Sequence, residues 1–183
     1  MTSHDSGHAA DPAVASPSLA GITLPAGFEG LTEHPRLLDV VVEALDAVEA
    51  ELSEAVSHAD ELADTTSRHL LEAGGKRIRP LLTILASLLG DPEVASGQVG
   101  EVGEQTRRAA VVMELTHLAT LYHDDVMDEA PVRRGAPTAH RMWGNSVAIL
   151  AGDLVFARAS QLMATLGPEA VRIQADTFER LVL

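Results

Sequence analysis

The stretch from Glu114 to Gly135, ELTHLATLYHDDVMDEAPVRRG, decides how the rest of the chain is interpreted. It carries three aspartates, Asp124, Asp125 and Asp128, in a D-D-x-x-D array near the end of a predicted helix. At about 100° per residue, Asp124 and Asp128 lie one turn apart on the face that also carries His117, while Asp125 lies to the side. The helix therefore gathers two carboxylates and an imidazole on one face.

The position of these aspartates is unfavourable for a bare helix. Like charges four residues apart destabilise a helix by roughly a few tenths of a kcal/mol, and the C-terminal end of a helix carries negative partial charge of its own. A bound cation would compensate for both effects. The candidate ligands are hard carboxylate oxygens and the sequence has no cysteine. We therefore expect Mg²⁺, which keeps water ligands and shares its coordination shell with phosphates.

Two groups of basic residues accompany the aspartates. Arg133 and Arg134 follow them after a short loop, and their forked donors suit phosphate oxygens. The stretch GGKRIRP supplies Lys76, Arg77 and Arg79. Its glycines let the backbone approach an anion, and it leads into a helix N-terminus, where anions bind. Carboxylates with a metal on one side and two basic clusters on the other suggest two separate polyphosphate groups.

The composition favours a helical protein and argues against several functions. Apolar residues make up 46% of the 183 residues and aromatic residues only 3%, so the core consists of Leu, Val, Ile and Ala, which favours helix over sheet. A net charge of −14 makes nucleic acid and anionic membranes poor partners. No secretion signal is present, and the longest apolar run, residues 81–89, is far shorter than the roughly 20 residues of a membrane span. Because there is no cysteine, we expect a cytoplasmic protein.

The rest of the pattern is helical. Residues 1–30, which contain several Pro, Gly and Ser and no sustained period, are predicted to form a disordered leader, and residues 31–183 a single domain. Apolar residues recur every three or four positions from Pro35 onwards, and no strand pattern is present. Gly74-Gly75 is a helix stop, and Pro80 suits the first residue of the next helix. The predicted helices cover residues 35–56, 59–71, 80–89, 100–128, 138–142 and 147–166, with a last helix from about 169.

These motifs resemble those of the trans-isoprenyl diphosphate synthases, the polyprenyl synthetase family. GGKRxRP is present as Gly74–Pro80, and DDxxD-x4-RRG as Asp124–Gly135. The flanking H-x-x-x-L-x-H is present as His117–His123, and G-N-x-x-A-I-L-x-G-D as Gly144–Asp153. The resemblance covers residues 35–183 and implies an all-α, antiparallel helical bundle of the isoprenoid synthase type.

For the chemistry, the resemblance implies a head-to-tail condensation. An allylic diphosphate ionises, isopentenyl diphosphate attacks the carbocation, and a proton is lost, with the leaving diphosphate as the implied acceptor. The resemblance assigns Mg²⁺ to Asp124 and Asp128, with Asp125 in support, and assigns the allylic diphosphate to Arg133 as well. It assigns the isopentenyl diphosphate to Lys76, Arg79, His117 and Arg134.

The family also carries a second aspartate-rich motif on a later helix. Nothing after Asp128 resembles it, since Asp153 and Asp176 are isolated. We therefore interpret the chain as the N-terminal portion of a synthase, a truncated or partial form whose bundle is incomplete at its C-terminus. The expected assembly is a homodimer, or a pairing with a partner chain that supplies the missing half. Asp153 is expected to satisfy a buried polar contact, and Gly144 to allow close contact between helices.

Product length in this family is limited by bulk just upstream of the aspartates. The positions five and four residues before Asp124 are Ala119 and Thr120, both small. The next bulky residue on the stripe is Met113, about 16 Å away along the helix. We therefore predict a product longer than the C15 type.

Two other functions stay open from the sequence. The first is a metal phosphohydrolase that uses the His123-Asp124 pair, with His117 and His140 as further ligands. It leaves GGKRIRP and the two arginines after the aspartates unexplained. The second is a non-catalytic subunit or remnant of a synthase, and the missing second aspartate motif supports it.

Overall fold

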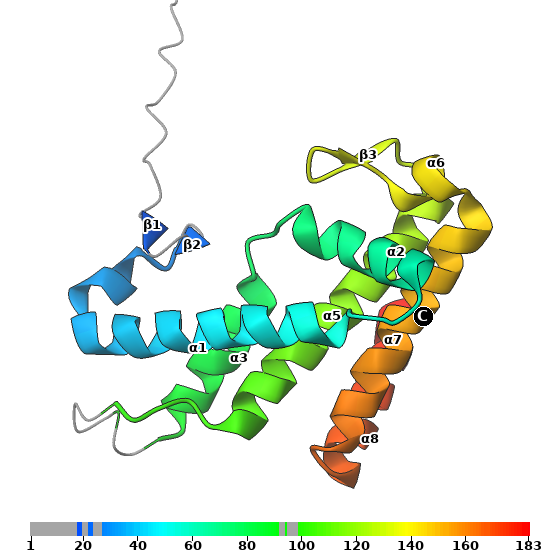
Figure 1. Ribbon diagram of the computed structural model, residues 1–183. Coiled ribbons are helices and arrows are strands. Elements are labelled where there is room, and N and C mark those ends of the chain that lie inside the picture. The colour runs from blue at the N-terminus through cyan, green and yellow to red at the C-terminus, as the bar shows by residue number, and fades with distance from the viewer. Residues whose placement is uncertain (1–17, 20–21, 24–26, 92–93, 95–98) are drawn as a thin grey trace, which may run out of the picture.

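The described part of the chain is almost entirely helical (Figure 1). The computed structural model describes residues 18–19, 22–23, 27–91, 94 and 99–183, so most of the predicted leader, residues 1–30, lies outside the described residues. The predicted all-α architecture is confirmed. The helices are the 3-10 helix η1 (Glu29–Glu33), α1 (Pro35–Ala55), α2 (Glu61–Glu72), α3 (Ile78–Leu89), α5 (Glu104–Met127), α6 (Ala139–Trp143), α7 (Asn145–Ala164) and α8 (Pro168–Val182).

Among the described residues, four strands of two residues each accompany the helices. β1 (Ser18–Leu19) pairs antiparallel with β2 (Ile22–Thr23), and β3 (Val132–Arg133) pairs antiparallel with β4 (Ala136–Pro137). The sequence pattern predicted no strand, because two residues are too few to show the alternation of apolar and polar side chains that marks a strand.

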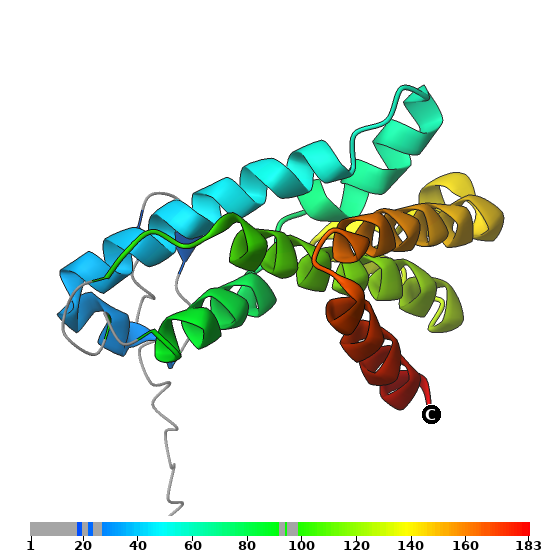
Figure 2. The same ribbon diagram turned by 90° about the horizontal axis from the view of Figure 1, so that it is seen from below.

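Helix α5 is the central element of the fold. It packs against α7, α3 and α1, and α7 runs beside it in the opposite direction (Figures 1 and 2). Its buried apolar side chains are not confined to one stripe, because neighbours cover it on several sides. They include Ala110, Val111, Val112, Leu115, Leu118, Ala119, Leu121 and Tyr122. The aspartates at the end of α5 are therefore carried by a rigid helix in the middle of the core.

Among the described helices, α2 has a side-chain N-cap, and several boundaries differ from the prediction: α5 begins at Glu104 rather than at residue 100, and α7 covers Asn145–Ala164 rather than 147–166. The side chain of Asp60 accepts a hydrogen bond from the backbone N–H of Ala63 at 2.9 Å and caps α2, which ends just before the predicted stop at Gly74. Helix α3 begins at Ile78, two residues before Pro80. Proline is tolerated there because the first four backbone N–H groups of a helix have no partner within the helix.

Tyr122 fixes α2 against the second half of α5. Its side chain is 1% exposed, as expected for a core residue. The Oη atom donates to the carbonyl oxygen of Thr66 and accepts from the backbone N–H of Leu70 at 3.2 Å. One buried hydroxyl thereby joins two helices and places the loop after α2 beside α5.

Helix α7 lies close to α5 because the facing residue is a glycine. A Cβ atom at Gly152 would lie 2.5 Å from Nε2 of His123 and 3.1 Å from Cβ of Tyr122, so a larger residue would displace the His123 ring and crowd α5. By length and composition alone, α7 is the one described helix that could cross a membrane. It packs against α5 along one face, which buries Ala148, Ala151, Gly152 and Val155.

Two expectations for this region were wrong. Asp153 does not satisfy a buried contact: its side chain is 60% exposed and lies 3.2 Å from Nε2 of His123 at the surface. Gly144 does not allow close contact, because a Cβ atom there would meet nothing within 4 Å. Its φ of 85° shows why glycine suits the position, since the chain must turn sharply between α6 and α7.

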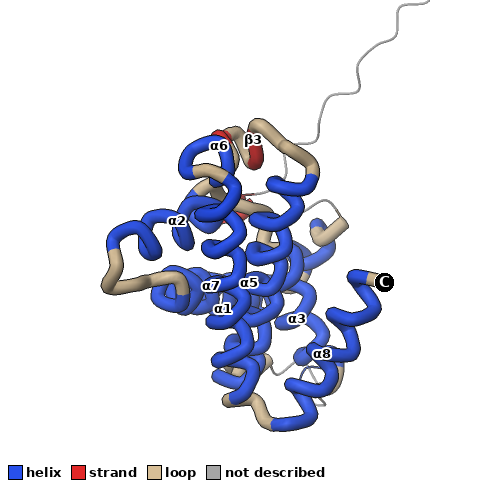
Figure 3. Tube along the Cα trace, turned by 90° about the vertical axis from the view of Figure 1, so that its right-hand side faces the viewer, coloured by secondary structure: helices blue, strands red, loops and turns tan. Residues whose placement is uncertain are grey.

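Helix α8 contacts α7 and then diverges from the α5–α7 pair (Figures 2 and 3). None of its residues is buried. Between α8, α7 and α5 lies an open groove of about 340 Å³ with an almost wholly apolar lining. The lining includes Met113 and Thr116 of α5, Met163 of α7, and Ile173, Phe178 and Leu181 of α8.

Candidate functional site

Asp124 and Asp128 stand at the C-terminal end of α5 with their carboxylates unengaged. Asp124 is half-buried and Asp128 is exposed. Within the described ranges, no ion pair or side-chain hydrogen bond holds either carboxylate. The two side chains are one helical turn apart, and hard oxygen donors in that arrangement fit a divalent cation such as Mg²⁺. The donor set therefore suits the expected metal.

Asp125 is in a different environment from its two neighbours. Its side chain is 2% exposed, and Oδ1 accepts from Nε and Nη2 of Arg133 at 2.7 and 2.6 Å. The other oxygen, Oδ2, is buried and has no hydrogen-bond partner. Asp125 thus holds Arg133 beside the end of α5. Contact of Arg133 with a diphosphate stays a prediction, and the arginine side chain is 29% exposed.

The two arginines after the aspartates are presented by a hairpin. Arg134 and Gly135 form its two-residue turn, with φ angles of 53° and 83°. Positive φ at both turn positions matches the right-handed twist of short hairpins, and it explains the glycine at the second position. The hairpin is anchored to α2, because Nε2 of His69 lies 2.7 Å from the carbonyl oxygen of Pro137.

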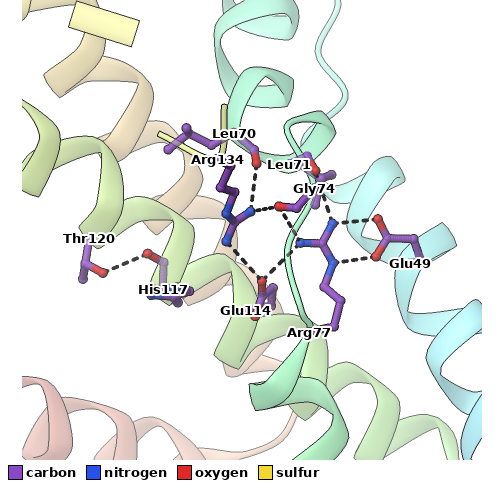
Figure 4. Close-up of polar contacts among 9 residues, drawn as sticks. All are labelled: Glu49, Leu70, Leu71, Gly74, Arg77, Glu114, His117, Thr120 and Arg134. Atoms are coloured by element: carbon purple, nitrogen blue, oxygen red, sulfur yellow. Dashed lines mark hydrogen bonds and ion pairs between the residues drawn. The ribbon is translucent and has the colours of Figure 1, made fainter. Parts of the chain in front are cut away.

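The hairpin and the GGKRIRP loop meet above α5. Nη1 of Arg134 donates to the carbonyl oxygens of Leu70, at 3.0 Å, and of Gly74 (Figure 4). Nη2 of Arg134 lies 4.0 Å from Oε1 of Glu114. The structure therefore brings together two motifs that are about 60 residues apart in the sequence. Whether Arg134 holds isopentenyl diphosphate stays a prediction, since these contacts place it in the wall of the site.

Lys76 and Arg79 are the two basic residues of GGKRIRP whose side chains stay unengaged in the described structure. Both side chains are exposed, and among the described residues neither has an ion-pair or hydrogen-bond partner. Arg77, between them, is by contrast engaged on all sides. The geometry therefore separates the basic residues of GGKRIRP into one structural arginine and two free cations.

The basic side of the site, counted without Asp124 and Asp128, has an excess of positive charge in an acidic protein. Five cations, Lys76, Arg77, Arg79, Arg133 and Arg134, accompany three carboxylates, Glu49, Glu114 and Asp125, which leaves an excess of two positive charges. Burial lowers the pKa of Arg134. The charge of Glu114 opposes the shift, and the surrounding arginines add to it. Such a site attracts a multivalent anion.

His117 lies half-buried on α5 among these arginines. Burial lowers its pKa to about 4, and the charges of Arg79, Arg134 and Arg133 act in the same direction. The imidazole is therefore neutral at neutral pH and can donate a hydrogen bond without adding charge.

The lowered pKa of His117 predicts acid sensitivity. Below a pH of about 6.5, His117 is protonated in the unfolded chain, whereas in the folded chain it is protonated only as the pH approaches 4. The free energy of unfolding therefore falls as the pH drops from about 6.5 to about 4. His117→Asn should reduce the drop in urea midpoint between pH 7 and pH 4.5. His34→Asn, at an exposed position, serves as the control and should leave the drop as it is. An equal drop in the unmodified chain and in His117→Asn would contradict the prediction.

The three residues predicted to control product length lie in different environments. Ala119 is 1% exposed within the core, so it does not line the groove. Thr120 is half-buried, and its Oγ1 donates to the carbonyl oxygen of His117 at 2.8 Å. Met113 is 43% exposed and lines the apolar groove described above. The stripe of α5 that carries Asp124 therefore continues upstream into an apolar groove.

The histidines needed for a phosphohydrolase are not gathered by the fold. Nε2 of His123 faces α7, 3.3 Å from the carbonyl oxygen of Ile149, whereas His117 lies among the arginines and His140 lies on α6. Among the described residues, no three His, Asp or Glu side chains form a group that could hold a metal on its own. A metal at Asp124 and Asp128 would thus depend on further oxygen ligands such as diphosphate or water.

Sequence reasoning gave no role to two residues that shape the site. His69 anchors the hairpin, and nothing in the sequence marks it as a partner of Pro137. Glu114 contacts both basic motifs, and one signal was available for it. An acidic residue three positions before His117 lies near it on one side of the helix, within an otherwise apolar segment.

The class that the fold and site define is an all-α protein in which unengaged carboxylates at a helix end accompany a cluster of cations. Residues 60–183 match the polyprenyl synthetase family, and the chain belongs to that family. It is 54% identical over 136 residues to nonaprenyl diphosphate synthase of Mycobacterium tuberculosis, covering 74% of this chain and 38% of the relative. It is 42% identical over 134 residues to heptaprenyl diphosphate synthase component 2 of Geobacillus stearothermophilus, covering 73% and 39%.

The solved structures agree with this assignment. Geranylgeranyl pyrophosphate synthase of Corynebacterium glutamicum, crystallised with calcium and isoprenyl diphosphate, is 46% identical, with a TM-score of 0.65 over 81% of this chain and 42% of that chain. The present chain thus spans about two fifths of the length of the relatives it matches. The predicted resemblance is confirmed for the region that the comparison covers.

Proposed function

We propose that the chain takes part in a Mg²⁺-dependent condensation of an allylic diphosphate with isopentenyl diphosphate to give a polyprenyl diphosphate. One observation carries this proposal. The fold leaves Asp124 and Asp128 unengaged at one end of α5, and it leaves Lys76 and Arg79 unengaged in the basic cluster that includes His117. Two separate sites of complementary chemistry suit two separate diphosphates.

The residues divide between the two substrates. Asp124 and Asp128 would hold Mg²⁺, which when bound neutralises the charge that develops on the departing diphosphate. Arg133, held by Asp125, would contact the same diphosphate. Neutral His117 would donate one hydrogen bond to the isopentenyl diphosphate, which Lys76, Arg79 and Arg134 would neutralise. No side chain is required as a general base, because the departing diphosphate can accept the proton.

The relatives support the finer parts of this proposal. The Corynebacterium glutamicum enzyme was crystallised with a divalent cation and isoprenyl diphosphate, which supports a divalent cation here. The Geobacillus stearothermophilus relative is named as one component of a synthase, which supports a second chain as partner. We propose that the active form is either a homodimer or an assembly with a chain that supplies the remaining helices.

The direct test is prenyl transfer by the purified chain. Radiolabelled isopentenyl diphosphate is incubated with an allylic diphosphate, with Mg²⁺ and with EDTA, and calorimetry measures the binding of each diphosphate separately. We expect metal-dependent binding of the allylic diphosphate and metal-independent binding of isopentenyl diphosphate. Release of phosphate from nucleotides without any binding of prenyl diphosphates would favour the phosphohydrolase instead.

A second function, that of a non-catalytic subunit, is favoured by the sequence after Asp128, in which Asp153 and Asp176 are isolated and nothing resembles a second aspartate-rich motif. A non-catalytic subunit would bind one or both diphosphates without turnover when alone. Adding a chain that carries the missing part of the family fold would separate the two cases. Turnover that is regained only in the mixture, and lost when Asp124 is replaced, assigns the metal site to this chain.

The apolar groove predicts the length of the product in any active assembly. Because Ala119 is buried and Thr120 is small, the next bulky apolar side chain on the stripe of α5 that carries Asp124 is Met113, about 16 Å along the axis. The product should therefore exceed C15, and Met113→Phe should shorten it. Chromatography of the radiolabelled product measures its length. A product that stops at C15 in the unmodified protein would contradict the prediction.

A further inference from the structure

Glu114 is a buried acid in the middle of the helix that carries the aspartates. Its side chain is 2% exposed. Its Oε1 lies 3.3 Å from Nη1 of Arg77 and 4.0 Å from Nη2 of Arg134 (Figure 4). A buried carboxylate is retained at a large desolvation cost unless cations compensate for it. Oε1 of Glu114 therefore lies close to one arginine from each of the two basic motifs.

The same two arginines also meet at the glycine pair of GGKRIRP. Nη1 of Arg77 donates to the carbonyl oxygen of Gly74 at 3.4 Å, and Nη1 of Arg134 donates to the same oxygen. A Cβ atom at Gly75 would lie 2.7 Å from Nη1 of Arg77 and 2.9 Å from Nη1 of Arg134. A side chain at residue 75 would therefore displace the two guanidinium groups from these positions.

Arg77 is committed to this arrangement from every side. Its Nε and Nη2 bind the carboxylate of Glu49 at 2.7 and 2.8 Å, and Nη2 also donates to the carbonyl oxygen of Leu71 at 3.2 Å. Its φ of 47° starts α3 in a left-handed conformation. No donor of Arg77 is left for a ligand of any size, so its function is to hold the backbone.

The fixed position of Arg77 also places its neighbours in the sequence. Lys76 precedes it and Arg79 lies two residues beyond it in the first turn of α3, and both are exposed and unengaged in the described structure. Glu114 lies three residues before His117 on α5. A link from Glu114 to Arg77 thus fixes two free cations relative to the helix that carries the neutral imidazole.

We propose that Glu114 is a positioning residue for the isopentenyl diphosphate site. Through Arg77 and Arg134 it holds the GGKRIRP loop at one distance from α5, so that Lys76, Arg79 and His117 converge on a single diphosphate. This inference rests on the proposed function. Glu114 touches no substrate, and its effect reaches the ligand only through the two arginines.

Glu114→Gln tests the inference, because it keeps the size of the side chain and removes its charge. The Kd for isopentenyl diphosphate should rise by about tenfold or more, as expected when binding groups are misplaced by about an ångström. The Kd for the allylic diphosphate with Mg²⁺ should stay within about twofold, because in the described structure neither Asp124 nor Asp128 has a hydrogen bond or ion pair with Glu114. Amide hydrogen exchange over residues 75–79 should become faster.

A control is available in another ion pair of α5, formed by Arg107 of α5 with Glu51 of α1. Oε1 of Glu51 lies 3.3 Å from Nε of Arg107, the same distance as in the Glu114–Arg77 pair, and it also joins α5 to another element. Glu51→Gln should change neither Kd nor the exchange of residues 75–79. If Glu114 had a purely structural role, Glu114→Gln would weaken the binding of both diphosphates equally, and that result would overturn the proposal. So would an isopentenyl diphosphate Kd that stays within about twofold.

Two further outcomes, a variant that does not fold and a chain that binds neither diphosphate, require a second variant and hydrogen exchange. If Glu114→Gln does not fold, Arg77→Lys replaces it, since lysine keeps the charge but cannot reach Glu49, Gly74 and Glu114 together. In Arg77→Lys the same selective loss of isopentenyl diphosphate binding is expected, and an unchanged Kd for isopentenyl diphosphate overturns the inference. If the unmodified chain binds neither diphosphate, the proposed function fails. Hydrogen exchange still decides the positioning role: faster exchange in the variant supports it, and unchanged exchange refutes it.

Discussion

Replacing Asp124 with asparagine is expected to abolish the Mg²⁺-dependent binding of an allylic diphosphate. In an assembly that turns over, kcat should fall by on the order of 100-fold to 1,000-fold, the usual cost of losing one preorganised electrostatic contact. The reason is that the carboxylate of Asp124 is unengaged in the described fold, so its charge is available to a cation. Asparagine keeps the shape and removes the charge.

The stability of this variant separates a metal ligand from a structural acid. Asp124→Asn should keep or slightly raise the free energy of unfolding, because it relieves repulsion with Asp128 and with the negative helix end, each worth roughly a few tenths of a kcal/mol. Asp125→Asn should instead destabilise the fold by roughly 3 kcal/mol. It breaks a pair in which the acid is 2% exposed and leaves Arg133 without its partner.

Calorimetric titration of Mg²⁺ with an allylic diphosphate, together with urea unfolding, measures both quantities. Asp46→Asn, on the exposed face of α1, controls for the loss of one negative charge. Unchanged binding in Asp124→Asn, or a loss of stability equal to that of Asp125→Asn, would refute the assignment of Asp124 to the metal.

Replacing Lys76 and Arg79 together with alanine is expected to weaken isopentenyl diphosphate binding by about 100-fold to 10,000-fold. Each hydrogen bond to a charged group contributes roughly 1.5–3 kcal/mol, and neither side chain has a hydrogen bond or an ion pair in the described structure. For the same reason, the free energy of unfolding should change by less than about 0.5 kcal/mol.

The comparison with Arg77→Ala makes this prediction specific. Arg77 lies between the two free cations but binds Glu49, Glu114 and backbone carbonyls, so its loss should destabilise the fold as well as the site. Arg180→Ala on α8 controls for the loss of one exposed cation. Binding and unfolding are measured for all variants at one ionic strength, because exposed charges are screened by salt. Lys76 and Arg79 would lose their assigned role if the double variant bound isopentenyl diphosphate as tightly as the unmodified chain.

The sequence by itself determined the class of fold and the kinds of chemistry. Helical periodicity is a local property, so the spans of α1, α5 and α7 could be predicted to within a few residues. The aspartates and the basic motifs are likewise contiguous in the chain, and their ligand preferences follow from the side chains alone. The start of α3 was misplaced by two residues, because Pro80 satisfies the helix rules at more than one position in the first turn.

The tertiary structure decided which of these charges are free. Arg77 and Lys76 are neighbours in the sequence, yet one is enclosed by acids and carbonyls from other elements and the other is exposed. Asp125 and Asp124 differ in the same way, because the hairpin brings Arg133 to only one of them. The buried Glu114 is joined to Arg77 across 37 residues of sequence. Such pairings depend on how distant elements come together, and no local pattern of residues specifies them.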